Sequence, residues 1–156
     1  MRRADREITS RARIDEIIRG CEVCHLGMAD GDQPYVVPVS FGYDGSSVYF
    51  HSARDGRKLD VIAVNPRVCV QFERRAVLMP SETEACGWSF AFESAIGLGV
   101  VEELRDPEAK ALGLNQIMLH YSGRRWEFDP STLARTRVWR VAIEELTGKQ
   151  SSPKVP

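Results

Sequence analysis

The sequence predicts a mainly β fold, in which six or seven largely antiparallel strands form a barrel with flanking helices packed outside it. Short segments rich in valine and aromatic residues recur along the chain, and the turn signals Asp30-Gly31-Asp32 and Asp44-Gly45 separate them. Such short connections favour antiparallel pairing of successive strands. With 156 residues, 43% of them hydrophobic, the chain has the size and apolar content of one domain. We expect a single domain over 1–156, with an ordered core from about residue 5 to residue 149.

The first half of the chain is predicted to hold a helix, three strands and a second helix. Thr9 and Ser10 can cap a helix that runs to about Arg19, where Gly20 ends it. Strands are predicted at 22–29, 34–43 and 47–52, followed by a short helix at 57–64 that stops before Asn65-Pro66.

The second half is predicted to hold the remaining strands and one longer helix. We expect a strand at 68–73, and then a loop of undefined structure at 74–87. Residues 88–104 form either two strands or one long strand bent at Gly97 and Gly99. Asp106-Pro107 starts a helix that runs to about Tyr121, and apolar alternation predicts a last strand at 137–146.

Charge and hydropathy exclude several classes of protein. The 21 basic and 22 acidic residues give a net charge of -1, which argues against nucleic-acid binding by bulk charge. No apolar run is long enough to span a bilayer, so no membrane association is expected. The charged start of the chain lacks the apolar segment of a signal peptide, which predicts a cytoplasmic protein with reduced cysteines.

The segment from His51 to Lys58 carries most of the chemistry that the sequence offers. It leaves a strand and enters a helix, and it contains Arg54, Arg57 and Lys58 beside Ser52 and a glycine. Backbone N–H groups at a helix start, together with cations and a hydroxyl, suit an anionic phosphate. A solvated helix start that happens to be basic is the alternative interpretation.

A second motif, Cys21-Glu22-Val23-Cys24-His25, matches the attachment pattern of c-type haem. Against this, no export signal is present and the motif falls within a predicted strand, where alternate side chains face opposite sides. No metal site is expected, because Cys69 and Cys86 do not form a second close pair. Buried core cysteines are the favoured interpretation.

At the basic helix start, the sequence resembles the FMN-binding split-barrel superfamily, and within it the Nim-type, 5-nitroimidazole-resistance-like branch. The resemblance covers about residues 5–149. The segments that carry it are 34–43 (PYVVPVSFGY), 48–53 (VYFHSA), 56–58 (GRK), 65–69 (NPRVC), 94–99 (SAIGLG) and 147–149 (TGK).

This resemblance implies a split β-barrel homodimer with FMN bound at the subunit interface. The implied cofactor-binding residues are Pro38, Val39, Phe41, His51, Ser52, Ala53, Arg57, Lys58, Trp88 and Ser94. Trp88, which alternates with Phe90 and Phe92, is expected to reach the partner subunit's site. Val36 and Phe41 stand where the related oxidases carry basic residues, and the oxidases' substrate-binding tail is missing. Oxidation of pyridoxamine phosphate is therefore not expected.

The resemblance implies an FMN-dependent oxidoreductase that reduces small electron-poor molecules such as nitroaromatics. A reduced donor, such as a nicotinamide, would load the flavin. His51 is the candidate catalytic residue, because an imidazole can orient a substrate or donate a proton near neutral pH. Two alternatives remain open at this point: a flavin-binding or redox-sensing protein without turnover, and a haem-binding split-barrel protein.

Overall fold

Eight antiparallel strands form one continuous sheet, in the order β3-β2-β6-β7-β8-β5-β4, with β1 paired to β8. The structure is a computed structural model that describes residues 4–151. The strands are β1 (Glu7–Ile8), β2 (Cys24–Asp30), β3 (Gln33–Val39), β4 (Gly42–Tyr43), β5 (Ser47–Ser52), β6 (Arg67–Met79), β7 (Ser89–Leu104) and β8 (Arg137–Gln150). The helices are α1 (Arg11–Arg19), α2 (Arg57–Val64), α3 (Pro107–Ser122) and α4 (Pro130–Arg135). The predicted mainly β split barrel is confirmed, with one or two strands more than expected.

The elements with clear end signals match their predictions. Ser10 caps α1 by accepting a hydrogen bond from the backbone of Arg13, and the helix ends at Gly20. Both α2 and β5 have the predicted bounds. Asp106 caps α3 by accepting hydrogen bonds from two backbone N–H groups of its first turn. Local capping chemistry decides these boundaries, which is why the sequence predicts them.

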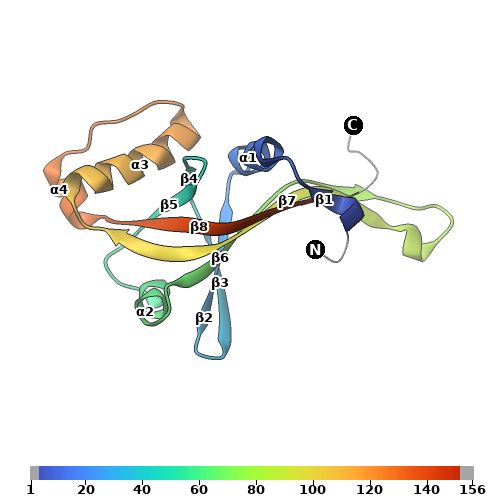
Figure 1. Ribbon diagram of the computed structural model, residues 1–156, viewed down its shortest axis with the longest axis horizontal. Helices are drawn as coiled ribbons and strands as arrows, with labels where there is room; N and C mark the ends of the chain where they lie inside the picture. Colours follow the sequence, from blue (N-terminus) through green and yellow to red (C-terminus); the bar gives the residue numbers. More distant parts are fainter. Residues whose placement is uncertain (1–3, 152–156) are drawn as a thin grey trace.

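The prediction of a loop at 74–87 is wrong over its first part, since β6 continues to Met79. There β6 pairs with β7, Leu78 facing Phe90, after an irregularity between Arg74 and Val77. Figure 1 shows this hairpin extending away from the rest of the sheet, at the end opposite α3 and α4. We call residues 77–90 the arm.

Other departures arise from tertiary pairing. The strand predicted at 34–43 is interrupted after Val39, so that β3 and β4 lie at opposite edges of the sheet. By contrast, one of the two alternatives for residues 88–104 is confirmed: β7 is a single long strand, with a register shift between Leu98 and Gly99 against β8. The sequence reading missed β1, a two-residue strand that exists only by pairing with β8, and the short helix α4.

The core lies between the sheet and α1 and α2. Phe41, Phe50 and Phe72 are fully buried, and the rings of Phe41 and Phe72 meet edge to face at 5.1 Å. From α1, Ile14, Ile17 and Ile18 form the predicted apolar stripe. A second cluster, centred on Tyr49 and Val138, packs beneath α3. These two clusters hold the ends of β5 and the start of α2 in place.

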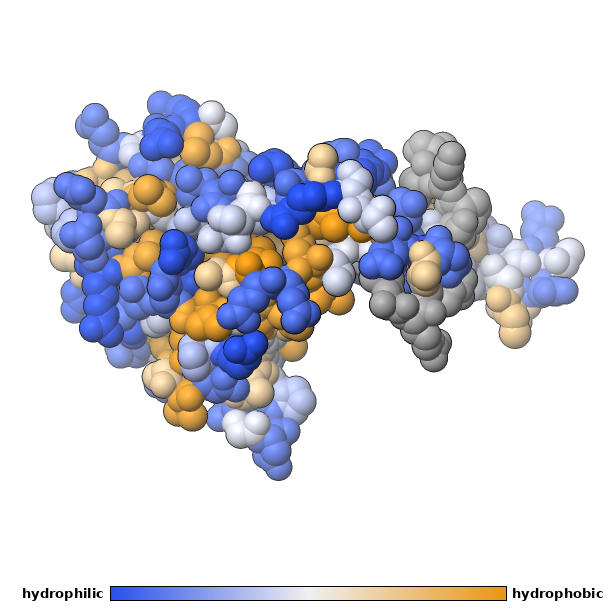
Figure 2. Space-filling model, in the orientation of Figure 1, coloured by the Kyte–Doolittle hydropathy of each residue, from blue (hydrophilic) through white to orange (hydrophobic). Residues whose placement is uncertain are grey.

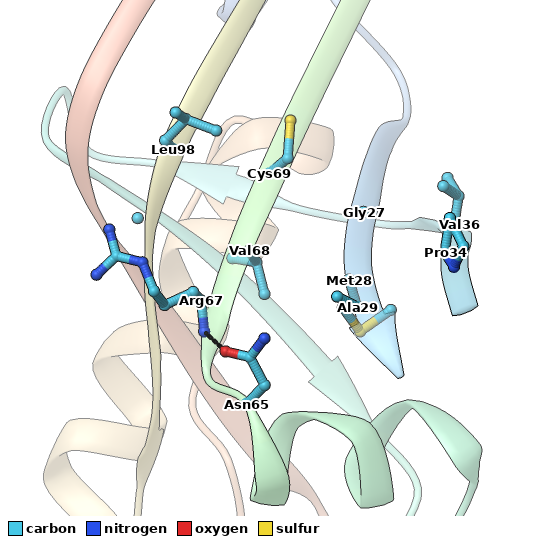
Figure 3. A pocket seen from close by; sticks show the side chains of 11 residues that line it. Gly27, Met28, Ala29, Pro34, Val36, Asn65, Arg67, Val68, Cys69 and Leu98 are labelled. Atoms are coloured by element: carbon cyan, nitrogen blue, oxygen red, sulfur yellow. Dashed lines mark hydrogen bonds between the residues drawn. The ribbon is translucent and has the colours of Figure 1, made fainter. Parts of the chain in front are cut away.

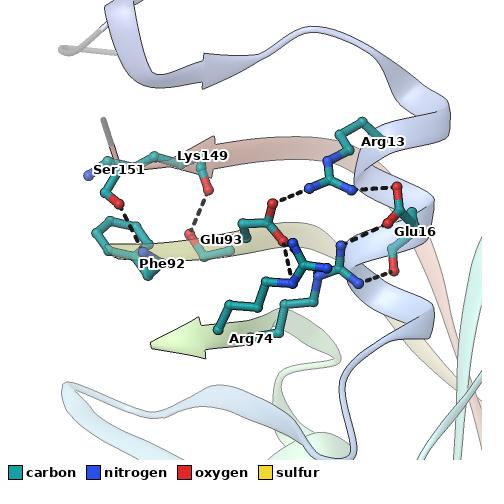
Figure 4. A network of polar contacts seen from close by, with 9 residues as sticks. Arg13, Glu16, Arg74, Phe92, Glu93, Lys149 and Ser151 are labelled. Carbon is teal, nitrogen blue, oxygen red and sulfur yellow. Dashed lines mark hydrogen bonds and ion pairs between the residues drawn. The ribbon is translucent and has the colours of Figure 1, made fainter. Parts of the chain in front are cut away.

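An ionic network joins α1 to the base of the arm (Figure 4). The carboxylate of Glu93 is 5% exposed and pairs with Arg13 and with the Nε of Arg74 at 2.8 Å. Arg74 also donates to Glu16 at 3.0 Å, and Arg13 pairs with the same carboxylate. Because several charges share their partners, the network fixes the angle between α1 and the arm.

This network predicts a loss of stability in acid. Hydrogen bonds from Arg13 and then Arg74 lower the pKa of Glu16 from 4.5 to about 2. A lowered folded-state pKa stabilises the protein above the unfolded pKa, and the contribution is lost as the pH falls from 4.5 towards 2. Urea unfolding at a series of pH values should show this decline, and Glu16→Gln should make it shallower. An identical acid decline in the variant would contradict this assignment.

Candidate functional site

A hollow of about 430 Å³ lies at the start of α2, between that helix and the edge strand β3. We call it the helix-start hollow. It is lined by Tyr35, Val37, Pro38, Ser52, Ala53, Asp55, Gly56, Arg57, Lys58 and Leu59. Five of the ten predicted cofactor residues therefore come together here: Pro38, Ser52, Ala53, Arg57 and Lys58. Its volume lies within the range of pockets that hold small ligands and cofactors.

The backbone at the start of α2 is open to a ligand. Gly56 has a φ of 141°, a conformation that side-chain-bearing residues rarely adopt, and a Cβ there would meet nothing within 4 Å. No side chain of residues 4–151 caps this helix. Within residues 4–151 the backbone N–H groups of Arg57 and Lys58 have no hydrogen-bond partner, whereas that of Leu59 donates to the carbonyl of Gly56 at 2.8 Å. The helix dipole favours an anion beside the two open groups.

Lys58 supplies a cation without an ion-pair partner in the described part of the chain. Its ammonium group lies 5.4 Å from the ring centre of Phe50, and within residues 4–151 it forms no ion pair. Desolvation by the surrounding protein lowers the pKa of Lys58 from its ordinary value. A half-buried and unpaired cation is costly, and a bound anion would remove that cost.

Arg57 is held by the β2–β3 hairpin. Its guanidinium donates to Asp30 at 3.1 and 3.3 Å and lies over the ring of Tyr35, 4.6 Å from its centre. These hydrogen bonds use the Nε–H and one Nη2–H of the guanidinium. Its other three N–H donors remain for a ligand. The sequence reading did not identify Asp30 or Tyr35, because their contacts with Arg57 arise from the fold.

Ser52 is held in place at the opposite wall. Its hydroxyl accepts a hydrogen bond from the indole of Trp139 at 3.0 Å and donates to the carbonyl of Ala53 at 2.9 Å. Trp139 in turn stacks on Phe50, with ring centres 6.2 Å apart. Trp139 was also missed, since it comes from β8, far away in the sequence.

His51 lies next to the hollow but not in its lining. Phe50 and Ser52 face Trp139, so alternation along β5 directs His51 to the other side, with Tyr49. Desolvation, and then the positive charge of Lys58, lower the pKa of His51 below its ordinary value. Both causes favour a neutral imidazole at neutral pH.

The remaining predicted residues lie elsewhere in the subunit. Val39 and Phe41 belong to the core, and Phe41 has no exposed surface. Trp88 stands on the arm with 52% of its surface exposed. Ser94, on β7, donates to the carbonyl of Lys149 at 3.5 Å. None of these four lines the helix-start hollow of its own subunit.

A second depression follows the outer face of β3, β2 and β6, and we call it the outer-face trough. His25, Gly27, Val36, Cys69 and Gln71 line one part of about 390 Å³. Gly27, Val36 and Cys69 continue into a larger part of about 540 Å³, which Leu98 and Arg67 also line (Figure 3). Figure 2 shows apolar surface gathered where β2, β3 and β6 meet.

The Cys-x-x-Cys-His motif is divided between two environments: its cysteines lie in the core, and His25 lines the outer-face trough. Cys21 and Cys24 are buried free thiols, and burial raises their pKa values to about 11 and about 12. The expectation of core cysteines is confirmed for these two, whereas Cys69 is half-buried and Cys86 exposed. The expectation that the motif falls within one strand is wrong, because β2 begins only at Cys24. Buried, protonated thiols are poor candidates for covalent attachment of a haem.

Several solved structures are similar to this chain over most of its length. A candidate 5-nitroimidazole antibiotic resistance protein of Bacteroides thetaiotaomicron is 33% identical, with a TM-score of 0.82 over 92% of this chain and 86% of that one. Two more distant structures share the fold: the flavocytochrome Anf3 of Azotobacter vinelandii, with 20% identity and a TM-score of 0.83 (98% of this chain, 72% of that one), and an FAD and haem binding protein of Mycobacterium smegmatis, with 19% and 0.84 (97% and 76%).

One curated protein sequence is similar to part of this chain. Protein RA0666 of Rhizobium meliloti is 30% identical over 64 residues, which are 41% of this chain and 42% of that protein. None of the helices described within residues 4–151 is long and apolar enough to cross a membrane. The family profile described as pyridoxamine 5'-phosphate oxidase matches residues 10–150. The chain belongs to this pyridoxamine 5'-phosphate oxidase family, a family of flavin-binding split barrels.

Proposed function

We propose that this protein is an FMN-dependent oxidoreductase that reduces small electron-poor molecules such as nitroaromatics. The observation that carries the proposal is the helix-start hollow, where the unpaired Lys58 adjoins the uncapped start of α2. Its similarity to a candidate 5-nitroimidazole resistance protein supports the acceptor class.

The residues of the hollow fit the parts of FMN. Lys58, Arg57 and the first N–H groups of α2 would hold the phosphate, and Ser52 adds a hydroxyl. Tyr35, Val37 and Pro38 offer an apolar edge to a flat ring. Bound flavin would supply the electron transfer, while these residues would orient it and exclude water. A phosphate monoester matches a hollow with two adjacent cations, which is why we favour FMN.

We further propose that two copies associate and complete each site. The arm exposes Val77, Leu78, Met79, Trp88 and Phe90, each with at least 40% of its surface accessible. Large apolar side chains exposed on both faces of an extended hairpin are typical of an interface. Trp88 and Ser94, which lie outside the hollow of their own subunit, would then approach the hollow of the partner. Light scattering should give twice the 17.5 kDa chain mass.

A role for His51 stays a prediction. His51 precedes Ser52 on β5 and does not line the hollow. Its imidazole, whose pKa is lowered, would therefore act at the margin of the site. If His51→Ala leaves both flavin content and the rate of nitroreduction unchanged, His51 has no catalytic or orienting role.

Turnover assays test the proposed reaction. With a reduced nicotinamide as the donor, the flavin-loaded protein should oxidise that nicotinamide when a nitroaromatic acceptor is added. Rates at background with every donor and acceptor, in a protein that holds flavin, would identify a flavin-binding or redox-sensing protein and overturn the oxidoreductase proposal.

A further inference from the structure

The outer-face trough contains polar groups that the proposed flavin site does not use. His25 and Gln71 stand opposite each other in the ladder between β2 and β6. Both line the part of about 390 Å³, and within residues 4–151 neither side chain has a hydrogen-bond partner. The rest of that lining is Gly27, Val36 and Cys69. A largely apolar depression with two convergent polar groups has the composition of a small-molecule site.

Gly27 forms the floor of the trough, because it has no side chain. Along the ladder it lies between Val36 and Cys69, where a side chain would otherwise rise from the sheet. A Cβ at this position would meet Cys69 at 3.5 and 3.6 Å and Val36 at 4.0 Å, which are ordinary contacts. No steric constraint of the fold therefore demands glycine here, and a larger residue would fill the trough without disturbing the strands.

The trough also lies beside the proposed flavin site. The edge strand β3 separates the two: Tyr35, Val37 and Pro38 line the helix-start hollow, whereas Val36 lines the trough. Pro38 pairs with His25, so the polar end of the trough is adjacent to the strand on which the flavin ring would rest. A molecule in the trough would therefore lie next to the flavin.

We propose that the outer-face trough is the binding site of the electron acceptor, a small planar nitroaromatic whose ring lies over Gly27 between Val36 and Cys69. His25 and Gln71 donate hydrogen bonds to the oxygens of its nitro group. This inference rests on the proposed function, because it assigns the substrate site of that reaction. It gives His25, the last residue of the unused cysteine motif, a role in binding.

Calorimetric titration of a 5-nitroimidazole, without any electron donor, tests the trough independently of turnover. Gly27→Val should weaken binding by about tenfold or more, because the added side chain occupies the floor of the trough. His25→Ala and Gln71→Ala should each weaken it about three- to tenfold, since each removes one hydrogen bond. Glu145→Ala is the matched control: Glu145 extends the same row beyond Leu98, outside the trough, and its replacement should leave the affinity unchanged.

The same titrations distinguish the possible failures. FMN affinity and oligomeric state are measured for every variant, and both should stay at their unsubstituted values. An unchanged nitroimidazole affinity in Gly27→Val would overturn the proposal. Weaker FMN binding in Gly27→Val would assign the trough to the flavin ring, and a monomer would assign it to the subunit interface; either result overturns it. If the unsubstituted protein binds no flavin, the proposed function fails, and with it the trough's role as an electron-acceptor site. A nitroimidazole affinity that Gly27→Val weakens would in that case still place the ligand in the trough.

Discussion

Replacing Lys58 by methionine is expected to weaken FMN binding by at least about tenfold, because hydrogen bonds to charged groups contribute about 1.5–3 kcal/mol. Methionine keeps an unbranched side chain, one atom shorter than that of lysine, and removes the ammonium group with its charge and its three N–H donors. Desolvation already lowers the pKa of Lys58, and no carboxylate neutralises it within the described part of the chain. A phosphate would therefore be its first ionic partner. Fluorescence quenching during FMN titration measures the change.

Riboflavin provides the control for this variant, because it has the ring of FMN but no phosphate. Its affinity should be the same for Lys58→Met and for the unsubstituted protein. The double variant Arg57→Ala/Lys58→Ala should lose FMN during gel filtration. Equal FMN occupancy in the double variant would exclude the start of α2 as the phosphate site.

Replacing Glu93 by alanine is expected to lower the free energy of unfolding by about 3 kcal/mol, the effect of removing one partner from a buried ion pair. The Glu93 side chain is 5% exposed, and Arg74, 13% exposed, loses its better-buried partner in the variant. Urea unfolding measures the difference. Since the network joins α1 to the base of the arm, the variant should also weaken association between subunits.

The pair Arg67–Glu144 is the matched control for this change. It has a comparable separation of 3.1 Å, but its side chains are 69% and 50% exposed. Solvent screens such a pair, so Glu144→Ala should change stability by less than about 1 kcal/mol. Equal changes in the free energy of unfolding for Glu93→Ala and Glu144→Ala would show that the buried network stabilises the fold no more than an exposed ion pair does.

Local signals predicted the fold well. Ser10, Gly20 and Asp106 mark helix ends through their own hydrogen bonds, and each marks an observed end. The arm escaped prediction because residues 74–79 have no strong alternation and become a strand only by pairing with β7. Likewise, β1 exists only through its two-residue ladder with β8. Pairings between distant segments are not written in a local pattern.

The same distinction between local and long-range signals applies to the candidate site. Arg57, Lys58 and Ser52 are close in sequence, so the basic helix start could be recognised from their spacing. Tyr35 and Trp139 join them only in the folded chain, through a cation–ring contact and a hydrogen bond. The trough depends on three strands in register, and no local pattern of the sequence predicted it.

The visible absorption spectrum of the purified protein, before and after addition of FMN, tests the central claim most directly. The account predicts two flavin bands that remain with the protein through gel filtration and move to the supernatant after acid precipitation, with quenched FMN fluorescence in the complex. Unquenched FMN that separates from the protein would contradict a flavin site at the start of α2. A Soret band retained in the precipitate would contradict it equally, and would show that the Cys21 and Cys24 thiols are reachable after all.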